Sequence, residues 1–377
     1  MQSILGTFRL ANLYQNANTG MVLFMPAKKK LTATKPTKAA QSESRPKAKN
    51  RSLGKARVAK EDEFYTQLPD IERELRHYRQ HFKGKVVYLN CDDPRVSNFF
   101  HYFTYNFEAL GLKKIIATCY KNQNVDLFSQ NTSEQSIWLE YTGDRNGNGV
   151  PDLVEIDIKK LKGDGDFRSE ESINFLKQAD IVVTNPPFSL FREYVAQLIE
   201  YDKKFLIVGN QNEITYREIF QLIRAGQIWL GHQSGDMKFR VPDYYAPRNT
   251  RYWVDEEGNK WRSFGNACWF TNLDIAKRHE DLVLYKIYNP KDHPKFDFYD
   301  AIAVSRVTDI PIDFAGVMGV PITFLSKHNP KQFEIIGLLA GNIKGLAGIP
   351  SSAAKDGPYI NGKLKYGRIL IRRKGSS

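Results

Sequence analysis

One segment constrains the fold more strongly than any other part of the chain. It spans Asp180–Phe191 and reads D-I-V-V-T-N-P-P-F-S-L-F. Its β-branched run, Ile181–Val183, is typical of a strand buried on both faces of a parallel sheet. Apolar residues at helical spacing follow from Leu190 to Ile199. A buried strand, a rigid turn and a returning helix indicate the carboxyl edge of an open α/β sheet, where such sheets bind their ligands.

The turn within this segment is Asn185-Pro186-Pro187-Phe188. Each proline removes a backbone donor and biases the residue before it toward extended geometry. The side-chain oxygen of Asn185 and a neighbouring main-chain carbonyl then form a small, stiff group of acceptors, which suits an exocyclic NH₂ group that reacts as a nucleophile. Phe188 offers a flat apolar face on which a ring can stack. A simpler interpretation is a Pro-Pro turn that closes a loop, with Phe188 as a core aromatic residue.

Longer blocks of sequence resemble a known family. V-T-N-P-P-F at the end of a strand resembles the catalytic motif of amino-group methyltransferases that use S-adenosylmethionine. N-P-P-F-S-L-F-R-E-Y, with G-D-F-R-S and C-D-D-P-R-V-S-N-F-F upstream, resembles the EcoRI-type adenine-specific DNA methyltransferases. This resemblance extends from about Lys83 to about Arg373. It implies a Rossmann-like, seven-stranded class I methyltransferase core in an α/β fold, with S-adenosyl-L-methionine as cofactor and double-stranded DNA as partner.

The resemblance also implies the site residues. The catalytic motif is Asn185, Pro186, Pro187 and Phe188, and the cofactor-binding residues are Asp92, Ser97, Asn98, Phe99, Tyr120, Asp166 and Phe167. Asp166 is expected to accept a hydrogen bond from the adenine amino group of the cofactor, with Phe167 packed on that ring. Tyr120 stands where an acid usually binds ribose, and is expected to stack on the same adenine.

The first loop departs from the family pattern, because it has none of the glycines that usually admit the cofactor. Individual roles there stay open. An ordinary turn at Asp93-Pro94 and an ordinary helix N-cap at Ser97 also explain the loop. For Asp166 and Phe167 the plainer alternative is a loop that precedes a helix.

Basic charge is concentrated at the start of the chain. The formal net charge is +13, and residues 1–60 carry 13 Lys and Arg against one acid. Residues 61–377 are nearly neutral, with 42 Lys and Arg against 41 Asp and Glu. Pro26–Lys60 is rich in Lys, Ala, Pro, Thr and Ser, which predicts a disordered basic arm. An electrostatic arm for nucleic acid and a solubilising leader are equally compatible with this composition.

Three parts are therefore predicted: a disordered basic arm at 1–60, a catalytic domain at 61–280 and a C-terminal target-recognition region at 281–377. Besides the segment at Asp180, the patterns predict strands at 86–89, 113–119, 137–141, 153–158, 205–209, 228–231 and 267–271. Predicted helices cover 64–81, 170–178, 215–225 and 331–339. The loop at 237–263 is of the kind that meets substrate. Trp269 is expected in the core rather than against a substrate base.

A competing metal-site hypothesis concerns Asp144–Glu155, which reads D-R-N-G-N-G-V-P-D-L-V-E and fits the spacing of an EF-hand calcium loop. An EF-hand needs a helix on each side, whereas here a β-like run enters and another leaves. Pro151 also takes a loop position that normally forms a hydrogen bond. A Gly- and Asn-rich hairpin turn explains the segment with less machinery, so we predict no metal site.

Cysteine usage and hydropathy bear on location. Cys91, Cys119 and Cys268 are far apart and odd in number, which fits neither a disulfide framework nor a zinc pattern and favours a reducing cytoplasm. No apolar run is long enough to span a membrane. We therefore expect a cytoplasmic protein with no membrane partner. A monomer is also expected, but the sequence leaves the oligomeric state open. The recognition sequence, a partner restriction endonuclease and the choice between Met1 and Met25 as start are left open.

Together these features predict a site-specific DNA methyltransferase that transfers a methyl group from S-adenosylmethionine to the exocyclic N6 amine of a flipped-out adenine. Two alternatives remain. The first is the same chemistry on RNA or on a protein glutamine, against which the long C-terminal region argues. The second is a catalytically inactive DNA-binding protein, which the glycine-free first loop supports.

Overall fold

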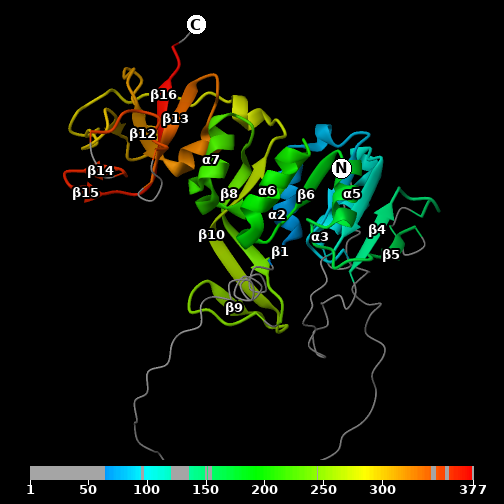
Figure 1. Cartoon of the computed structure of the whole chain (residues 1–377). Helices are drawn as coiled ribbons and strands as arrows, with labels where there is room; N and C mark the ends of the chain where they lie inside the picture. The colour runs from blue at the N-terminus through cyan, green and yellow to red at the C-terminus, as the bar shows by residue number, and fades with distance from the viewer. Residues whose placement is uncertain are drawn as a thin grey trace, which may run out of the picture. The chain divides into compact units, whose positions relative to one another are not determined.

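A mixed β-sheet with helices on both faces forms the body of the protein in the computed structural model (Figure 1). The structure describes residues 64–94, 97–119, 136–148, 151, 155–243, 245–340, 345–352 and 356–375. All of these lie in one compact unit, Asn50–Ser377. The arm predicted at 1–60 and the predicted cofactor residue Tyr120 lie outside the described residues.

Within the described residues the large sheet has ten strands, in the order β1-β8-β10-β7-β6-β2-β3-β4-β5, with β9 paired to β10. Their bounds are β1 Tyr65–Thr66, β2 Val86–Leu89, β3 Lys114–Thr118, β4 Ile137–Tyr141, β5 Asp157–Lys160, β6 Ile181–Thr184, β7 Lys204–Asn210, β8 Trp229–Arg240, β9 Tyr252–Val254 and β10 Lys260–Thr271. The sequence patterns predict eight of these strands, one more than the seven-stranded core that the resemblance implies. The short strands β1 and β9 are not predicted.

The four central strands β3, β2, β6 and β7 are parallel to one another. Alternate residues of each strand enter two separate core clusters, as Val182 and Val183 do. One cluster includes apolar residues of α5 (Glu170–Gln178), α6 (Phe191–Glu200) and α7 (Arg217–Arg224), and the other those of α2 (Leu68–Leu75) and α3 (Asn98–Tyr105). The strands are therefore buried on both faces, as their β-branched composition predicts.

Most predicted elements of this sheet are confirmed within a residue or two. Strands β4 and β5 form the expected antiparallel hairpin, and β8 and β10 are antiparallel as expected but much longer. The predicted helix at 64–81 is wrong at its start. Residues 65–66 form strand β1 against β8, and α2 begins only at Leu68, with Pro69 in its first turn, where proline fits a helix. Short helices complete this part, with α4 at Phe107–Leu110 and a 3₁₀ helix at Arg79–His81.

A second sheet of four strands occupies the C-terminal part, in the order β11-β12-β16-β13. Its strands are β11 Ile302–Ala303, β12 Met318–Pro321, β13 Phe333–Leu339 and β16 Arg368–Arg373, while β14 Tyr359–Ile360 and β15 Lys363–Leu364 form a separate hairpin. The helix predicted at 331–339 is wrong, because these residues form β13 and pair with β16. The β-branched pair Ile335–Ile336 fits a buried sheet better than a helix.

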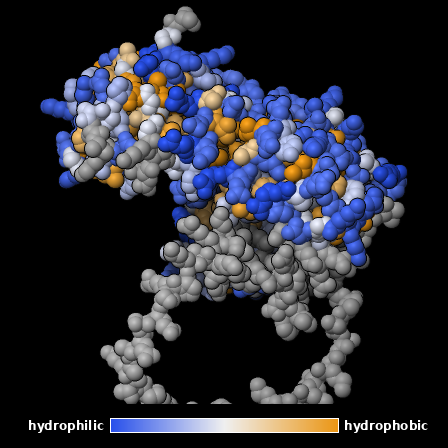
Figure 2. Space-filling view, in the orientation of Figure 1, coloured by the Kyte–Doolittle hydropathy of each residue, from blue (hydrophilic) through white to orange (hydrophobic). Residues whose placement is uncertain are grey.

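The outer face of the molecule in Figure 2 is mainly hydrophilic, with hydrophobic residues scattered among polar ones. In the part of the chain that the structure describes, no helix combines the length and apolar character that a membrane span requires.

Candidate functional site

Strands β2 and β6 end side by side at the carboxyl edge of the parallel sheet, and polar side chains join their ends. The Thr184 hydroxyl donates a hydrogen bond to the carbonyl oxygen of Asn90. The Tyr194 hydroxyl donates to Oδ1 of Asn90 over 2.5 Å, and both side chains are buried. This network fixes the last residue of β6, which directly precedes Asn185.

Asn185 is buried, with 6% of its surface exposed. Its Nδ2 donates to the carbonyl oxygen of Phe64, 2.5 Å away. Because a carbonyl oxygen accepts and never donates, this bond fixes the orientation of the amide. The Asn185 Oδ1 atom is buried and has no hydrogen-bond partner among the described residues. Such an atom is costly in a folded protein, and it is the acceptor that the sequence predicts at this position.

Phe188 lies in a group of aromatic rings. Pro186 is buried, and after Pro187 a short 3₁₀ helix, Phe188–Leu190, leads into α6. The Phe188 ring is partly exposed and lies 5.3 Å from the ring of Phe64 and 5.8 Å from that of Phe264, measured between centroids. Phe188 therefore has an accessible surface beside Asn185, and its inner side packs on residues from β10 and from the segment before β1.

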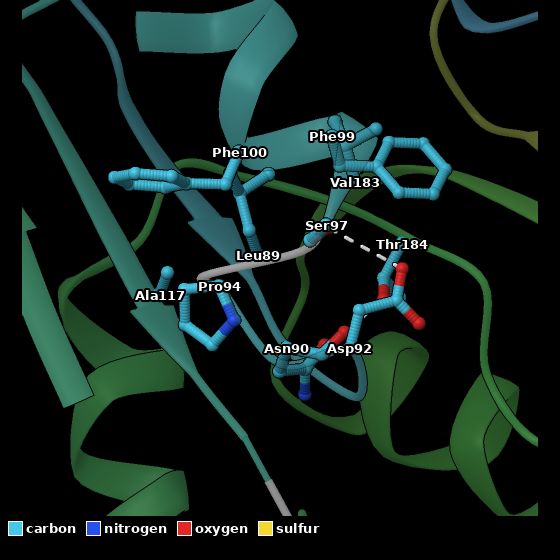
Figure 3. A pocket seen from close by; sticks show the side chains of 10 residues that line it. All are labelled: Leu89, Asn90, Asp92, Pro94, Ser97, Phe99, Phe100, Ala117, Val183 and Thr184. Carbon is cyan, nitrogen blue, oxygen red and sulfur yellow. Dashed lines mark hydrogen bonds between the residues drawn. The ribbon is translucent and has the colours of Figure 1, made fainter. Parts of the chain in front are cut away.

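The loop after β2 is the predicted cofactor loop. Cys91 takes a φ of 87°, a left-handed conformation that glycine usually provides in such turns. A narrow pocket lies between this loop and α3, and Asp92, Ser97 and Phe99 are among its lining residues. Figure 3 shows Ser97 facing Asp92, where its hydroxyl donates to Oδ2 over 3.3 Å. Three of the four residues predicted from this loop thus share one pocket.

Asn98, the fourth, makes a different contact. Its Nδ2 donates to the carbonyl oxygen of Thr66, 2.8 Å away, and so ties the start of α3 to strand β1. The same strand follows Phe64, which holds Asn185. Asn98 therefore supports the segment that orients the catalytic candidate.

Asp166 and Phe167 lie before α5. Both carboxylate oxygens of Asp166 accept hydrogen bonds from the Arg168 side chain, at 2.9 and 2.6 Å. Burial opposes ionisation of Asp166, but the bonds from Arg168 outweigh it and lower the pKa of this carboxyl. The buried Phe167 ring packs edge-on against Tyr194, with centroids 5.1 Å apart. Arg168 also pairs with Glu193 of α6.

Cys91 lies in the loop that follows β2. Burial raises the pKa of its thiol far above the usual value, and the charges of Asp92 and Asp166 raise it further. Residues from the ends of β2 and β6 and from the loop before α5 therefore converge at one place. The roles of Phe64, Asn90 and Tyr194 are not predicted from the sequence, because no local pattern marks contacts made across the fold.

The structure also describes part of the segment Asp144–Glu155, considered above as a calcium loop, and the side chain of Trp269. In the segment Asp144–Glu155, the Glu155 carboxylate accepts hydrogen bonds from the backbone N–H groups of Arg145 and Asn146, within the connection from β4 to β5. No group of three or more His, Cys, Asp or Glu placed to hold a metal occurs among the residues described. Trp269 is fully buried against Phe99 in the core, as expected.

Comparisons with known proteins extend the resemblance seen in the sequence. The chain is 51% identical over 332 residues to the Type II methyltransferase M.EcoRI of Escherichia coli, which covers 87% of this chain and 98% of that protein. It is 39% identical to the Type II methyltransferase M.MpnI of Mycoplasma pneumoniae and 38% identical to M.MgeORF184P of Mycoplasma genitalium, each covering 85% of this chain and 98% of the relative. No solved structure matches it. Residues 52–374 match the family described as adenine-specific methyltransferase EcoRI, and this chain belongs to that family.

Proposed function

We propose that this protein is a site-specific DNA methyltransferase that moves a methyl group from S-adenosylmethionine to the exocyclic N6 amine of adenine. The observation that carries the proposal is the buried Oδ1 of Asn185, an acceptor without a partner among the described residues. Family membership supports the reaction class. The names of the relatives, all Type II methyltransferases, support DNA as the substrate.

The chemical problem is the weak nucleophilicity of the adenine amine, whose lone pair is delocalised into the ring. Asn185 Oδ1 accepts a hydrogen bond from this amine and favours the pyramidal nitrogen of the transition state. The Pro186 carbonyl serves as the second acceptor. Because the Phe64 carbonyl already holds Nδ2 in place, Oδ1 needs no reorientation when charge develops on the nitrogen. No general base is required, since the proton can leave after transfer.

The base must also leave the duplex to reach Asn185, because the amine of a paired adenine is not accessible to a donor. Phe188 has the partly exposed ring on which the extruded base stacks, a contact worth about 1–3 kcal/mol. The rings of Phe64 and Phe264 support Phe188 from behind. They set the position of the stacking face relative to Asn185.

The cofactor region fits an adenosine-containing methyl donor. S-adenosylmethionine, when bound, supplies an electrophilic methyl group on a sulfonium ion. Asp92 and Asp166 bring two carboxylates to the same neighbourhood, around Cys91, where they bind hydroxyl and amino groups of the cofactor. Phe167 packs on the adenine, and Ser97 and Phe99 line the adjoining pocket.

The same proposal includes a catalytic domain at 61–280, a recognition domain at 281–377, a monomeric state and a cytoplasmic location.

Transfer of a labelled methyl group tests this function. Purified protein is incubated with tritiated S-adenosylmethionine and unmethylated duplex DNA, and the DNA is digested to nucleosides. We expect label in N6-methyl-2′-deoxyadenosine and a fixed sequence around each modified site. Label confined to cytosine, to RNA or to protein would contradict the proposal.

A further inference from the structure

The two long antiparallel strands β8 and β10 extend beyond the parallel strands and carry β9 at their far end (Figure 1). We call the residues 237–264 the hairpin extension. In its register Arg262 of β10 stands opposite Phe239 of β8 and Tyr252 of β9. Residues directly opposite in neighbouring strands share a face of the sheet. Arg262 therefore belongs to the face that carries Phe239 and Tyr252.

That face continues directly into the site of Asn185. Phe264, two residues after Arg262, lies 5.8 Å from Phe188 and 4.7 Å from Phe64, between ring centroids. Tyr245 lies 6.0 Å from Phe64 and stacks on Tyr252 at 6.4 Å. An aromatic surface thus runs from the Asn-Pro-Pro-Phe turn onto the hairpin extension.

Two arginines lie over this aromatic surface. The Arg262 guanidinium is 5.3 Å from the ring of Phe264, and that of Arg248 is 5.8 Å from the ring of Tyr245. The Arg262 Nη1 donates to the carbonyl oxygen of Thr250 over 3.3 Å, which fixes its direction. Its Nε is buried with no hydrogen-bond partner in the described part of the chain. Both rings beneath these arginines touch Phe64, whose carbonyl oxygen holds Asn185.

Two carboxylates in and beside the hairpin extension have partners other than Arg262. Asp255 binds the indole nitrogen of Trp261 and the backbone of its own turn, and that turn also carries Glu256 and Glu257. Arg251 is paired with Asp236. Among the described residues no carboxylate forms an ion pair with Arg262. Arg262, a planar cation held over an aromatic ring and outside any ion pair of the described structure, is well suited to a phosphate.

We propose that Arg262 and Arg248 bind the phosphodiester backbone of the nucleic acid beside the nucleotide that enters the Asn185 site. This inference rests on the proposed function and adds the surface through which the substrate is held. The guanidinium groups anchor the backbone, and the aromatic residues beneath them lead toward Phe188. Backbone contacts of this kind fix register and orientation rather than sequence.

The test is the salt dependence of duplex binding by Arg262→Ala and Arg248→Ala. Fluorescence anisotropy with a labelled short duplex of mixed sequence reports affinity at several salt concentrations, and no methyl transfer is needed. We expect each variant to bind about tenfold more weakly at low salt, and to lower the slope of log affinity against log salt by about one. Arg262→Lys should restore the slope and only part of the affinity.

Arg278→Ala is the matched control. Arg278 lies over the ring of Trp229 at 3.8 Å, and Trp229 is at the opposite end of β8. Its removal should lower the melting temperature and leave the salt slope unchanged. If Arg262→Ala behaves in the same way, Arg262 only packs on Phe264 and the inference is wrong. A wild-type protein that binds duplex with the expected slope but methylates no adenine would contradict the proposed function alone.

Discussion

Asn185 and Asp166 are two predicted site residues near the same edge of the sheet, and their surroundings differ. Asn185 is buried, its Nδ2 bound to Phe64, and its Oδ1 has no partner in the described structure. Asp166 is less buried, and both of its oxygens are occupied by Arg168. One side chain carries an unused acceptor, and the other has an internal partner of opposite charge.

This difference bears on what each residue can do. An unpaired buried acceptor destabilises the folded state, and a donor that arrives with the substrate removes that cost. Asn185 is thus arranged for a partner that comes and goes. Asp166 is stabilised without a ligand and remains ionised at neutral pH, because the bonds from Arg168 lower its pKa. A ligand there shares the carboxylate with Arg168, so we expect Asp166 to contribute to cofactor binding, and Asn185 mainly to the rate, with a smaller contribution to holding the target base.

The largest effect is expected for Asn185→Ala. Loss of one preorganised polar partner at a reacting group lowers turnover by roughly a hundredfold or more. Stability should change little, because the variant loses the bond to Phe64 but also removes the unpaired Oδ1. Single-turnover methyl transfer and thermal unfolding measure the two quantities separately.

Asn272→Ala is the matched control for this variant. Asn272 also bridges two backbone groups, accepting from the N–H of Phe205 and donating to the carbonyl of Lys203, so both ends of its amide are satisfied. Its loss should cost about 1–2 kcal/mol of stability and leave the single-turnover rate unchanged. Equal single-turnover rates in the two variants would show that the unpaired Oδ1 of Asn185 has no special role in methyl transfer.

A smaller effect is expected for Asp166→Ala. Charged hydrogen bonds contribute more than neutral ones, so affinity for S-adenosylmethionine should fall by about tenfold, with a weaker effect on single-turnover rate at saturating cofactor. Calorimetric titration measures the affinity. Glu193→Ala is the control, because Glu193 also pairs with Arg168. If both variants bind the cofactor equally weakly, Asp166 acts by orienting Arg168 and does not touch the cofactor.

The smallest effect concerns His77, which also has a buried unpaired atom, Nε2, in the described structure, but lies away from the sheet edge. It stacks on His232 with ring centroids 3.6 Å apart. Burial lowers the pKa of both histidines. The positive charges of Arg76 and Lys277 lower the pKa of His77 further. The pKa of His232 is lowered further by His77, Lys277 and Arg76, and Glu280 opposes this effect.

Histidines with a lowered pKa stay neutral in the folded state, while the unfolded chain takes up protons as the pH falls through the ordinary value of 6.5. Stability from this pair is present above that pH and is lost below it. Glu74 acts in the opposite sense, because burial raises its pKa. The double variant His77→Gln/His232→Gln should show a shallower loss of melting temperature on acidification, with unchanged methyl transfer. A slope equal to that of wild type would show that the pair does not titrate.

Local patterns predict the parallel core well, since the β-branched strands at 86–89 and 181–184 are buried on both faces and need no information from elsewhere. They also predict Asn185 as an acceptor. They do not predict its partner, because Phe64 lies 121 residues away and meets Asn185 through the backbone. The helix predicted at 331–339 is wrong for the same reason, because pairing with the distant strand β16 decides the structure of these residues. Arg168 is close to Asp166 in the sequence, but the sequence does not show that its side chain binds both carboxylate oxygens of Asp166.

The most direct measurement of the central claim is a double-mutant cycle between Asn185 and the target base. Duplexes carry either adenine or purine, which lacks the amine, at the methylated position found by sequencing. Binding is measured for wild type and Asn185→Ala in the presence of S-adenosylhomocysteine. If Oδ1 accepts a hydrogen bond from the N6 amine, the variant weakens binding of the adenine duplex by about 0.5–1.5 kcal/mol and leaves the purine duplex unaffected. Equal losses on both duplexes would show that Asn185 does not contact the amine.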